Sequence, residues 1–79
     1  MVLKLVVIPR GLHDRLIGMC DPKSREYDTL VNGFIIRDGN EEAVQIACDH
    51  AGTELILSFV RSRCPEMLRA ITLPADHSH

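Results

Sequence analysis

A chain of 79 residues has the length of one small domain, and 46% hydrophobic with 25% charged residues is an ordinary globular composition. These values exclude a low-complexity or disordered chain. With 9 Lys and Arg against 11 Asp and Glu, the formal net charge is -2, so no overall positive field attracts the protein to nucleic acid or to an anionic membrane.

The first elements predicted along the chain are a strand and a helix. Segment 2–9, VLKLVVIP, carries β-branched and aliphatic residues on both faces and ends at a proline, as a strand inside a sheet does. Segment 10–20 has apolar residues at helical spacing, namely Leu12, Leu16, Met19 and Cys20. Pro22 disfavours helical geometry at Asp21, so we expect this helix to end there.

Segment 29–36, TLVNGFII, has two interpretations. As a hairpin, Asn32 and Gly33 supply the positive-φ residues of a type I′ turn, and Val31 pairs with Phe34. As a helix, the segment is capped by Ser24 and carries an apolar stripe made of Tyr27, Leu30, Val31 and Phe34. We favour the hairpin, because Asn-Gly between apolar residues is the strongest short-range hairpin signal.

Segments 38–51 and 53–61 predict a helix followed by a strand. Asp38 or Asn40 can cap the helix, and Gly52 stands at its C-terminal end. With Asp38 as the cap, Glu41 is at capping-box spacing. The apolar stripe of this helix consists of Val44, Ala47, Cys48 and Ala51. In TELILSFVR, apolar residues alternate as in a buried strand, namely Leu55, Leu57 and Phe59. A continued helix also fits, because apolar residues recur four apart from Ala51 to Phe59, but Gly52 favours the strand.

Segment 64–74 remains open between two structures. Pro65 can begin a helical turn with Glu66 at its start, or 68–73 can form an edge strand. The last residues, 75–79, are polar and predict a flexible tail that follows a single α+β domain at 1–74.

With the hairpin, the predicted elements follow the order β-α-β-β-α-β. This is the order of a ferredoxin-like sandwich, in which one or two helices pack on an antiparallel sheet. The name describes topology only, because no iron-sulfur spacing is present in the sequence. We therefore expect a small single-domain α+β sandwich.

With the helix instead, the N-terminal half resembles the ribbon-helix-helix DNA-binding family. The resemblance rests on VVIPRGLHDRL, 6–16, followed by SREYDTLV, 24–31, and covers under half of the chain. It implies paired N-terminal strands that read the major groove in a dimeric DNA-binding regulator. The residues that would face the groove here are aliphatic, namely Leu3, Leu5 and Val7. They supply no donors or acceptors for base contacts, so we expect no nucleic-acid partner.

The cysteines and histidines predict neither a disulfide framework nor a metal site. Cys20, Cys48 and Cys64 are odd in number and contain no Cys-x-x-Cys pair. Cys48 and His50 point in different directions on a helix and cannot readily share one ion. His77 and His79 belong to the polar tail.

Nucleophilic catalysis is likewise without a motif. Arg61 and Arg63 lie near Cys64 in sequence, and cationic neighbours can activate a thiol. No partner base is identified, so we expect an inert thiol. We assign no catalytic, cofactor-binding or metal-binding residue and no cofactor.

These observations predict a cytoplasmic protein that is not an enzyme. A domain of this size that fills its interior with aliphatic residues has little volume for a substrate pocket. The sequence shows no signal segment, and no apolar run reaches the ~20 residues that span a bilayer, so we expect no membrane partner. We expect an interaction or oligomerising accessory module that self-associates or binds a protein partner through a sheet edge. A dimeric DNA-binding regulator is the alternative.

Overall fold

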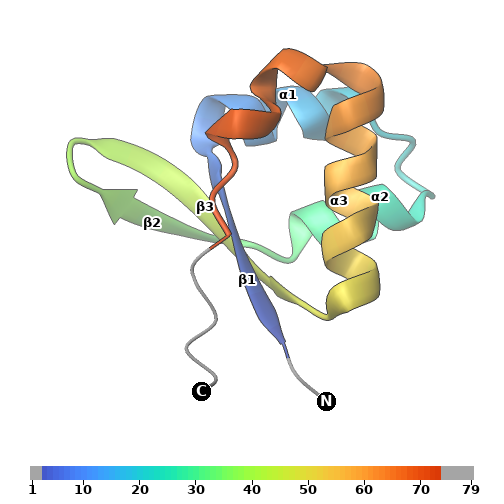
Figure 1. Ribbon diagram of the computed structural model, residues 1–79, viewed down its shortest axis with the longest axis horizontal. Helices are drawn as coiled ribbons and strands as arrows, with labels where there is room; N and C mark the ends of the chain where they lie inside the picture. Colours follow the sequence, from blue (N-terminus) through green and yellow to red (C-terminus); the bar gives the residue numbers. More distant parts are fainter. Residues whose placement is uncertain (1–2, 74–79) are drawn as a thin grey trace.

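The computed structural model describes residues 3–73 and has an α+β architecture (Figure 1). In chain order its elements are β1 (Lys4–Pro9), α1 (Arg10–Met19), α2 (Arg25–Val31), β2 (Phe34–Asp38), β3 (Glu41–Cys48), α3 (His50–Arg63) and the 3-10 helix η1 (Pro65–Ala70). The predicted α+β class, the first strand and the first helix are confirmed. The tail predicted at 75–79 lies outside the described residues.

The sheet is three-stranded and antiparallel, with β3 in the centre of the order β1-β3-β2. Val44 of β3 lies between Ile8 of β1 and Ile35 of β2. On its other side, β1 is bridged at Val7 to Thr72 by two backbone hydrogen bonds of 2.9 Å. The ferredoxin-like order is not confirmed. Two helices separate β1 from β2, and within residues 3–73 the chain after α3 contributes this bridge in place of a fourth strand.

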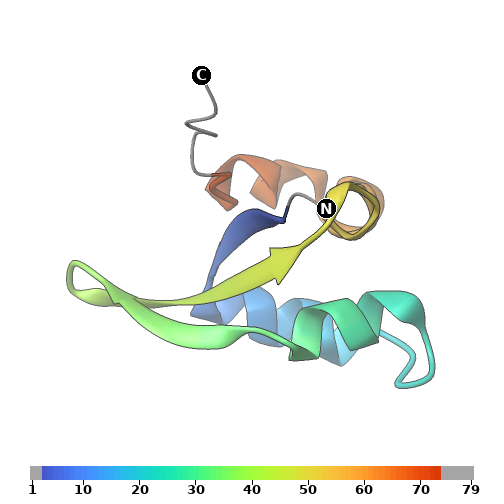
Figure 2. The same ribbon diagram turned by 90° about the horizontal axis from the view of Figure 1, so that it is seen from below.

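One hydrophobic core joins a face of the sheet to the helices. Its most deeply buried residues, each at most 1% exposed, include Ile8, Leu16, Leu30, Ile46 and Ile56. Met67 and Leu68 of η1 pack against the same cluster. The β2–β3 hairpin projects beyond the helices in both ribbon views (Figures 1 and 2). None of the described side chains of β2 therefore belongs to the core.

The helix predicted at 38–51 is wrong, because this segment forms a tight turn and then β3. Asp38 pairs with Glu41, which leaves Gly39 and Asn40 as a two-residue turn. Gly39 has a φ of 67°, as the first central residue of a type II′ turn requires. The residues assigned to a helix cap thus close a hairpin.

The apolar residues of β3 fit a strand as well as they fit a helix. Val44 and Ile46 are buried on the core face, while Gln45 between them is turned to the other face. Because β3 has partners along both sides, backbone pairing outweighs the helical spacing that the sequence also contains.

The strand predicted at 53–61 is also wrong. The helical alternative holds for this segment, but the helix is a new element, α3, that begins at His50 after β3 and does not continue a helix from 38–51. The carboxylate of Asp49 caps this helix and accepts a hydrogen bond of 2.8 Å from the Gly52 N–H. Thr53, Ile56 and Val60 form its buried stripe. Gly52 lies in the first turn of α3 and does not interrupt it.

Segment 29–36 is divided between the two interpretations. The Ser24 side chain caps α2 by accepting a hydrogen bond of 3.2 Å from the Tyr27 N–H, as the helical alternative predicted. The helix ends at Val31, and β2 begins at Phe34. The hairpin predicted at Asn32 is wrong, since this residue has a φ of -86° and its neighbours belong to a helix and a strand.

The strand-helix-helix order of the ribbon-helix-helix resemblance is present in β1, α1 and α2. The strand is used differently, however. β1 pairs with β3 of its own chain along its whole length, from Lys4 to Pro9, and Val7 is also bonded to Thr72. The pairing of N-terminal strands from two chains that the resemblance implied is therefore replaced by pairing within one chain.

Both structures considered for segment 64–74 occur in part. Pro65 begins η1 with Glu66 in its first turn. Thr72 then lies beside β1 as an isolated bridge. The chain thereby returns to the sheet at the edge opposite β2.

Gly33 is required by close packing. A Cβ atom at this position would clash with the Cγ1 atom of Val44, which is itself buried. We predict that Gly33→Ala lowers the free energy of unfolding by about 1–3 kcal/mol, as overpacking does. Gly18→Ala is the matched control, because a Cβ atom at this position would meet nothing within 4 Å. Since Gly18 lies in α1 and alanine favours a helix more than glycine does, this variant should not lower the free energy of unfolding. Urea denaturation measures both; equal stabilities of Gly33→Ala and the parent protein would contradict the prediction.

Candidate functional site

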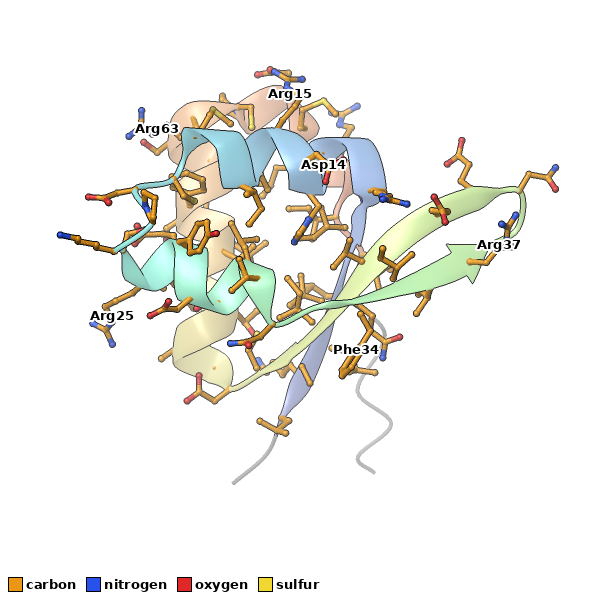
Figure 3. The ribbon with its side chains drawn as sticks, turned by 180° about the vertical axis from the view of Figure 1, so that it is seen from behind. Asp14, Arg15, Arg25, Phe34, Arg37 and Arg63 are labelled. Carbon is orange, nitrogen blue, oxygen red and sulfur yellow. The ribbon has the colours of Figure 1, made fainter. Side chains whose placement is uncertain are left out.

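The most exposed apolar residues of the sheet lie on β2, the strand without a partner on its outer side in the described sheet. Phe34 is 73% exposed and Ile35 is 56% exposed. The two side chains lie on opposite faces because they are neighbours in a strand. Figure 3 shows Phe34 on the side of β2 away from α1. Large apolar surface therefore borders the open edge on both faces.

The backbone hydrogen bonds of β2 can be assigned from the opposite edge of the sheet. Val7 exchanges its hydrogen bonds with Thr72, so it does not exchange them with Gln45, its opposite residue in β3. Bonding alternates along an antiparallel ladder, and Gln45 therefore directs its N–H and C=O to Phe34 in β2. It follows that Phe34 bonds to β3 and that Ile35 directs its backbone groups to the open edge.

The turn gives the same assignment independently. In a two-residue hairpin the closing pair, here Asp38 and Glu41, exchanges both hydrogen bonds. Every second residue back along β2 then also bonds to β3, which again includes Ile36 and Phe34. The N–H and C=O groups of Ile35 and Arg37 point outward. They form a ready template for another strand.

A shallow hollow lies near the other end of the sheet. It has a volume of about 50 Å³ and is lined by Val7, Pro9, Glu41, Glu42, Ala43, Ala70 and Thr72. Small-molecule sites are typically about 300–1,000 Å³ in volume. Glu42 at its rim already accepts a hydrogen bond of 2.6 Å from Arg10. This hollow is too small to hold a substrate.

The residues considered for metal binding are directed to different partners. The Cys48 Sγ lies 3.3 Å from the Thr53 hydroxyl, while the His50 Nδ1 lies 3.4 Å from the Lys4 ammonium nitrogen. Within residues 3–73, no group of three or more His, Cys, Asp or Glu side chains is arranged to hold a metal ion. His77 and His79 are outside the described residues.

The cysteine considered for catalysis is buried. Cys64 is 3% exposed and follows α3 as its C-cap, where its N–H donates to the Val60 carbonyl. The guanidinium of Arg63 lies 5.7 Å from the centre of the Phe59 ring. Burial raises the pKa of the Cys20 thiol and Glu26 raises it further, with Arg63 acting against both. A raised pKa lowers the thiolate fraction, so Cys20 is not an activated nucleophile.

Comparisons of the chain with models of protein families, with curated proteins and with solved structures find no match. Of the helices between residues 3 and 73, none combines the length and the apolar character needed to cross a bilayer. The candidate site therefore has to be judged on its own geometry.

A sheet edge was expected to bind a partner, but no position in the sequence was assigned to it. The apolar run from Phe34 to Ile36 was assigned to a hairpin with the preceding residues, and β3 was assigned to a helix. The signal that identifies the edge is Gly39-Asn40, a two-residue hairpin turn between this run and a segment that also alternates with a period of two.

The alternation of hydrogen bonds predicts a pattern of amide exchange in dilute solution. The amide protons of Ile35 and Arg37 should exchange with solvent at least about tenfold faster than those of Phe34 and Ile36, because the latter are held in the ladder. Hydrogen exchange followed by NMR measures all of them in one experiment. Equal protection from Phe34 to Arg37, or the reverse alternation, would show that the assigned bonding is wrong.

Proposed function

We propose that this protein is a small interaction module that binds an added β-strand, from a protein partner or from a second copy, along the open edge of β2. The observation that carries the proposal is the outward direction of the Ile35 and Arg37 backbone groups between exposed apolar side chains. In strand addition, such backbone groups supply affinity and the neighbouring side chains supply specificity.

The surroundings of β2 support strand addition. Natural edge strands that avoid pairing are very short, bulged, or carry proline or charged residues, above all lysine. β2, with the sequence FIIRD, has neither proline nor lysine, its two charged residues are confined to its C-terminal end, and it pairs with β3 in unbroken register. The hairpin also projects beyond the helices, so no element described in residues 3–73 covers its open side (Figure 1).

The topology supports the same edge. We propose that Thr72 marks a reduced fourth strand, since it is antiparallel to β1 and lies on the side of β1 opposite β3. The order Thr72, β1, β3, β2 then corresponds to a ferredoxin-like sheet whose first crossover contains two helices. In that arrangement one outer edge is occupied within the chain and β2 is the edge left for a partner.

The proposal that the module is not an enzyme rests on the small hollow and on the chemistry of the thiols. The hollow that borders Thr72 lacks the volume of a substrate site. Cys64 is buried, and Cys20 has a raised pKa. Neither cysteine is suited to attack a substrate.

A library of extended peptides displayed on phage tests strand addition. Selection against the immobilised protein should enrich peptides with alternating apolar residues. When a selected peptide is added, the changes in the NMR chemical shifts of the protein should be confined to 33–38. Ile35→Pro removes an N–H that faces solvent and leaves the bonds of Phe34 and Ile36 to β3 in place. We predict that it weakens binding of the selected peptides at least about tenfold, which is 1.4 kcal/mol.

Ile35→Thr is the matched control, because threonine keeps the N–H and the β-branched shape but loses apolar contact. Its affinity should lie between those of the parent protein and Ile35→Pro. Peptides whose binding is unchanged by Ile35→Pro, or whose shifts map to the helices, would contradict strand addition at β2.

A further inference from the structure

We propose that the strand added to β2 is β2 of a second copy, in a two-fold dimer whose axis passes through Ile35. This inference rests on the proposed function and names the partner. The dimer joins two three-stranded sheets into one continuous antiparallel sheet.

Symmetry limits the ways in which β2 can pair with itself. A two-fold axis perpendicular to the sheet joins antiparallel strands and keeps equivalent faces on the same side. Opposite residues then have numbers of the same parity. For at least three residues of each β2 to overlap, the axis has to pass through Ile35, Ile36 or Arg37. Each axis places Ile35 and Arg37, whose backbone groups point outward, in the bonded positions. The side chains therefore decide between the three.

The axis at Ile35 matches apolar residues with apolar residues. Phe34 lies opposite Ile36 of the second copy on one face, and the two Ile35 side chains meet on the other face. An axis at Ile36 would place Ile35 opposite the charged Arg37, and an axis at Arg37 would place two guanidinium groups opposite each other. Like charges opposite each other destabilise a ladder, whereas aromatic and β-branched pairs stabilise it.

The charge at the ends of the interface favours the same axis. Arg37 would lie opposite Gly33 of the second copy, which has no side chain and follows Asn32, the C-cap residue of α2. The last turn of α2 contains no basic residue. Arg37 is on the core-side face with Ile35, so its guanidinium would approach the helix end, where the partial charge is negative. Glu42, opposite Arg37 in the same chain, is already bonded to Arg10.

The interface explains the exposure of Phe34 and Ile35, which the fold alone leaves in solvent. It is formed by one short strand from each copy and resembles small, reversible interfaces in extent. We therefore expect a monomer-dimer equilibrium that depends on concentration.

Charge-reversal variants at the axis provide the test. Ile35→Lys and Ile35→Glu each place like charges opposite each other in the proposed dimer, so each variant alone should be monomeric by sedimentation velocity. An equimolar mixture should restore the dimer, because lysine then lies opposite glutamate. Dimer formation in the mixture also shows that both variants are folded. Leu3→Lys is the control, since Leu3 is 59% exposed at the other edge of the sheet and should leave the dimer intact.

The remaining outcomes overturn the proposal in distinguishable ways. Stronger self-association of Ile35→Glu would place residue 35 opposite Arg37 and move the axis to Ile36. A parent dimer that persists in Ile35→Lys would place the interface elsewhere. A parent protein that stays monomeric at every concentration but binds selected peptides at 33–38 would refute the second copy and keep strand addition. A monomer that binds no such peptide would refute both.

Discussion

The position of β3 between two strands is the constraint on which the rest of the structure depends. Successive residues of β3 bond alternately to β1 and to β2, so the bonding at one edge fixes the bonding at the other. The two hydrogen bonds between Val7 and Thr72 thus indicate that the backbone groups of Ile35 face the open side of β2. The turn at Gly39 gives the same direction, so both edges reflect one register of β3.

The two edge strands of the sheet, β1 and β2, have different surroundings, because the described chain returns to β1 after the last helices and leaves the outer side of β2 uncovered. α3 and η1 bring the chain back to β1, where Thr72 occupies the edge. The β2–β3 hairpin extends past the helices, and the core ends before it (Figure 2). Ile35 is opposite the buried Val44 and yet is more than half exposed, since no helix covers it. The open edge and its apolar border have the same cause.

The elements that could be predicted from the sequence are those whose local signals agree. Segment 2–9 has no competing helical pattern, and segment 10–20 has apolar residues at helical spacing with Pro22 beyond its end. At Val44 to Cys48, by contrast, helical and alternating patterns coexist, and only pairing with β1 and β2 decides between them. β1 is distant in sequence from β3, and the neighbouring β2 had been assigned to a different hairpin, so the pattern of residues within β3 did not decide between them. Wrong assignment of β3 also hid which strand was the edge.

An open apolar edge normally allows uncontrolled addition of strands, and a two-fold contact is one way to limit it. When the edge of one copy pairs with the same edge of another, neither edge remains available. The outer edges of the joined sheet are then the two β1 strands, in which Val7 is already bonded to Thr72. A dimer about Ile35 is therefore closed to further addition at β2, whereas pairing of β2 with β1 of another copy would require the Thr72 bridge to break and would continue without limit.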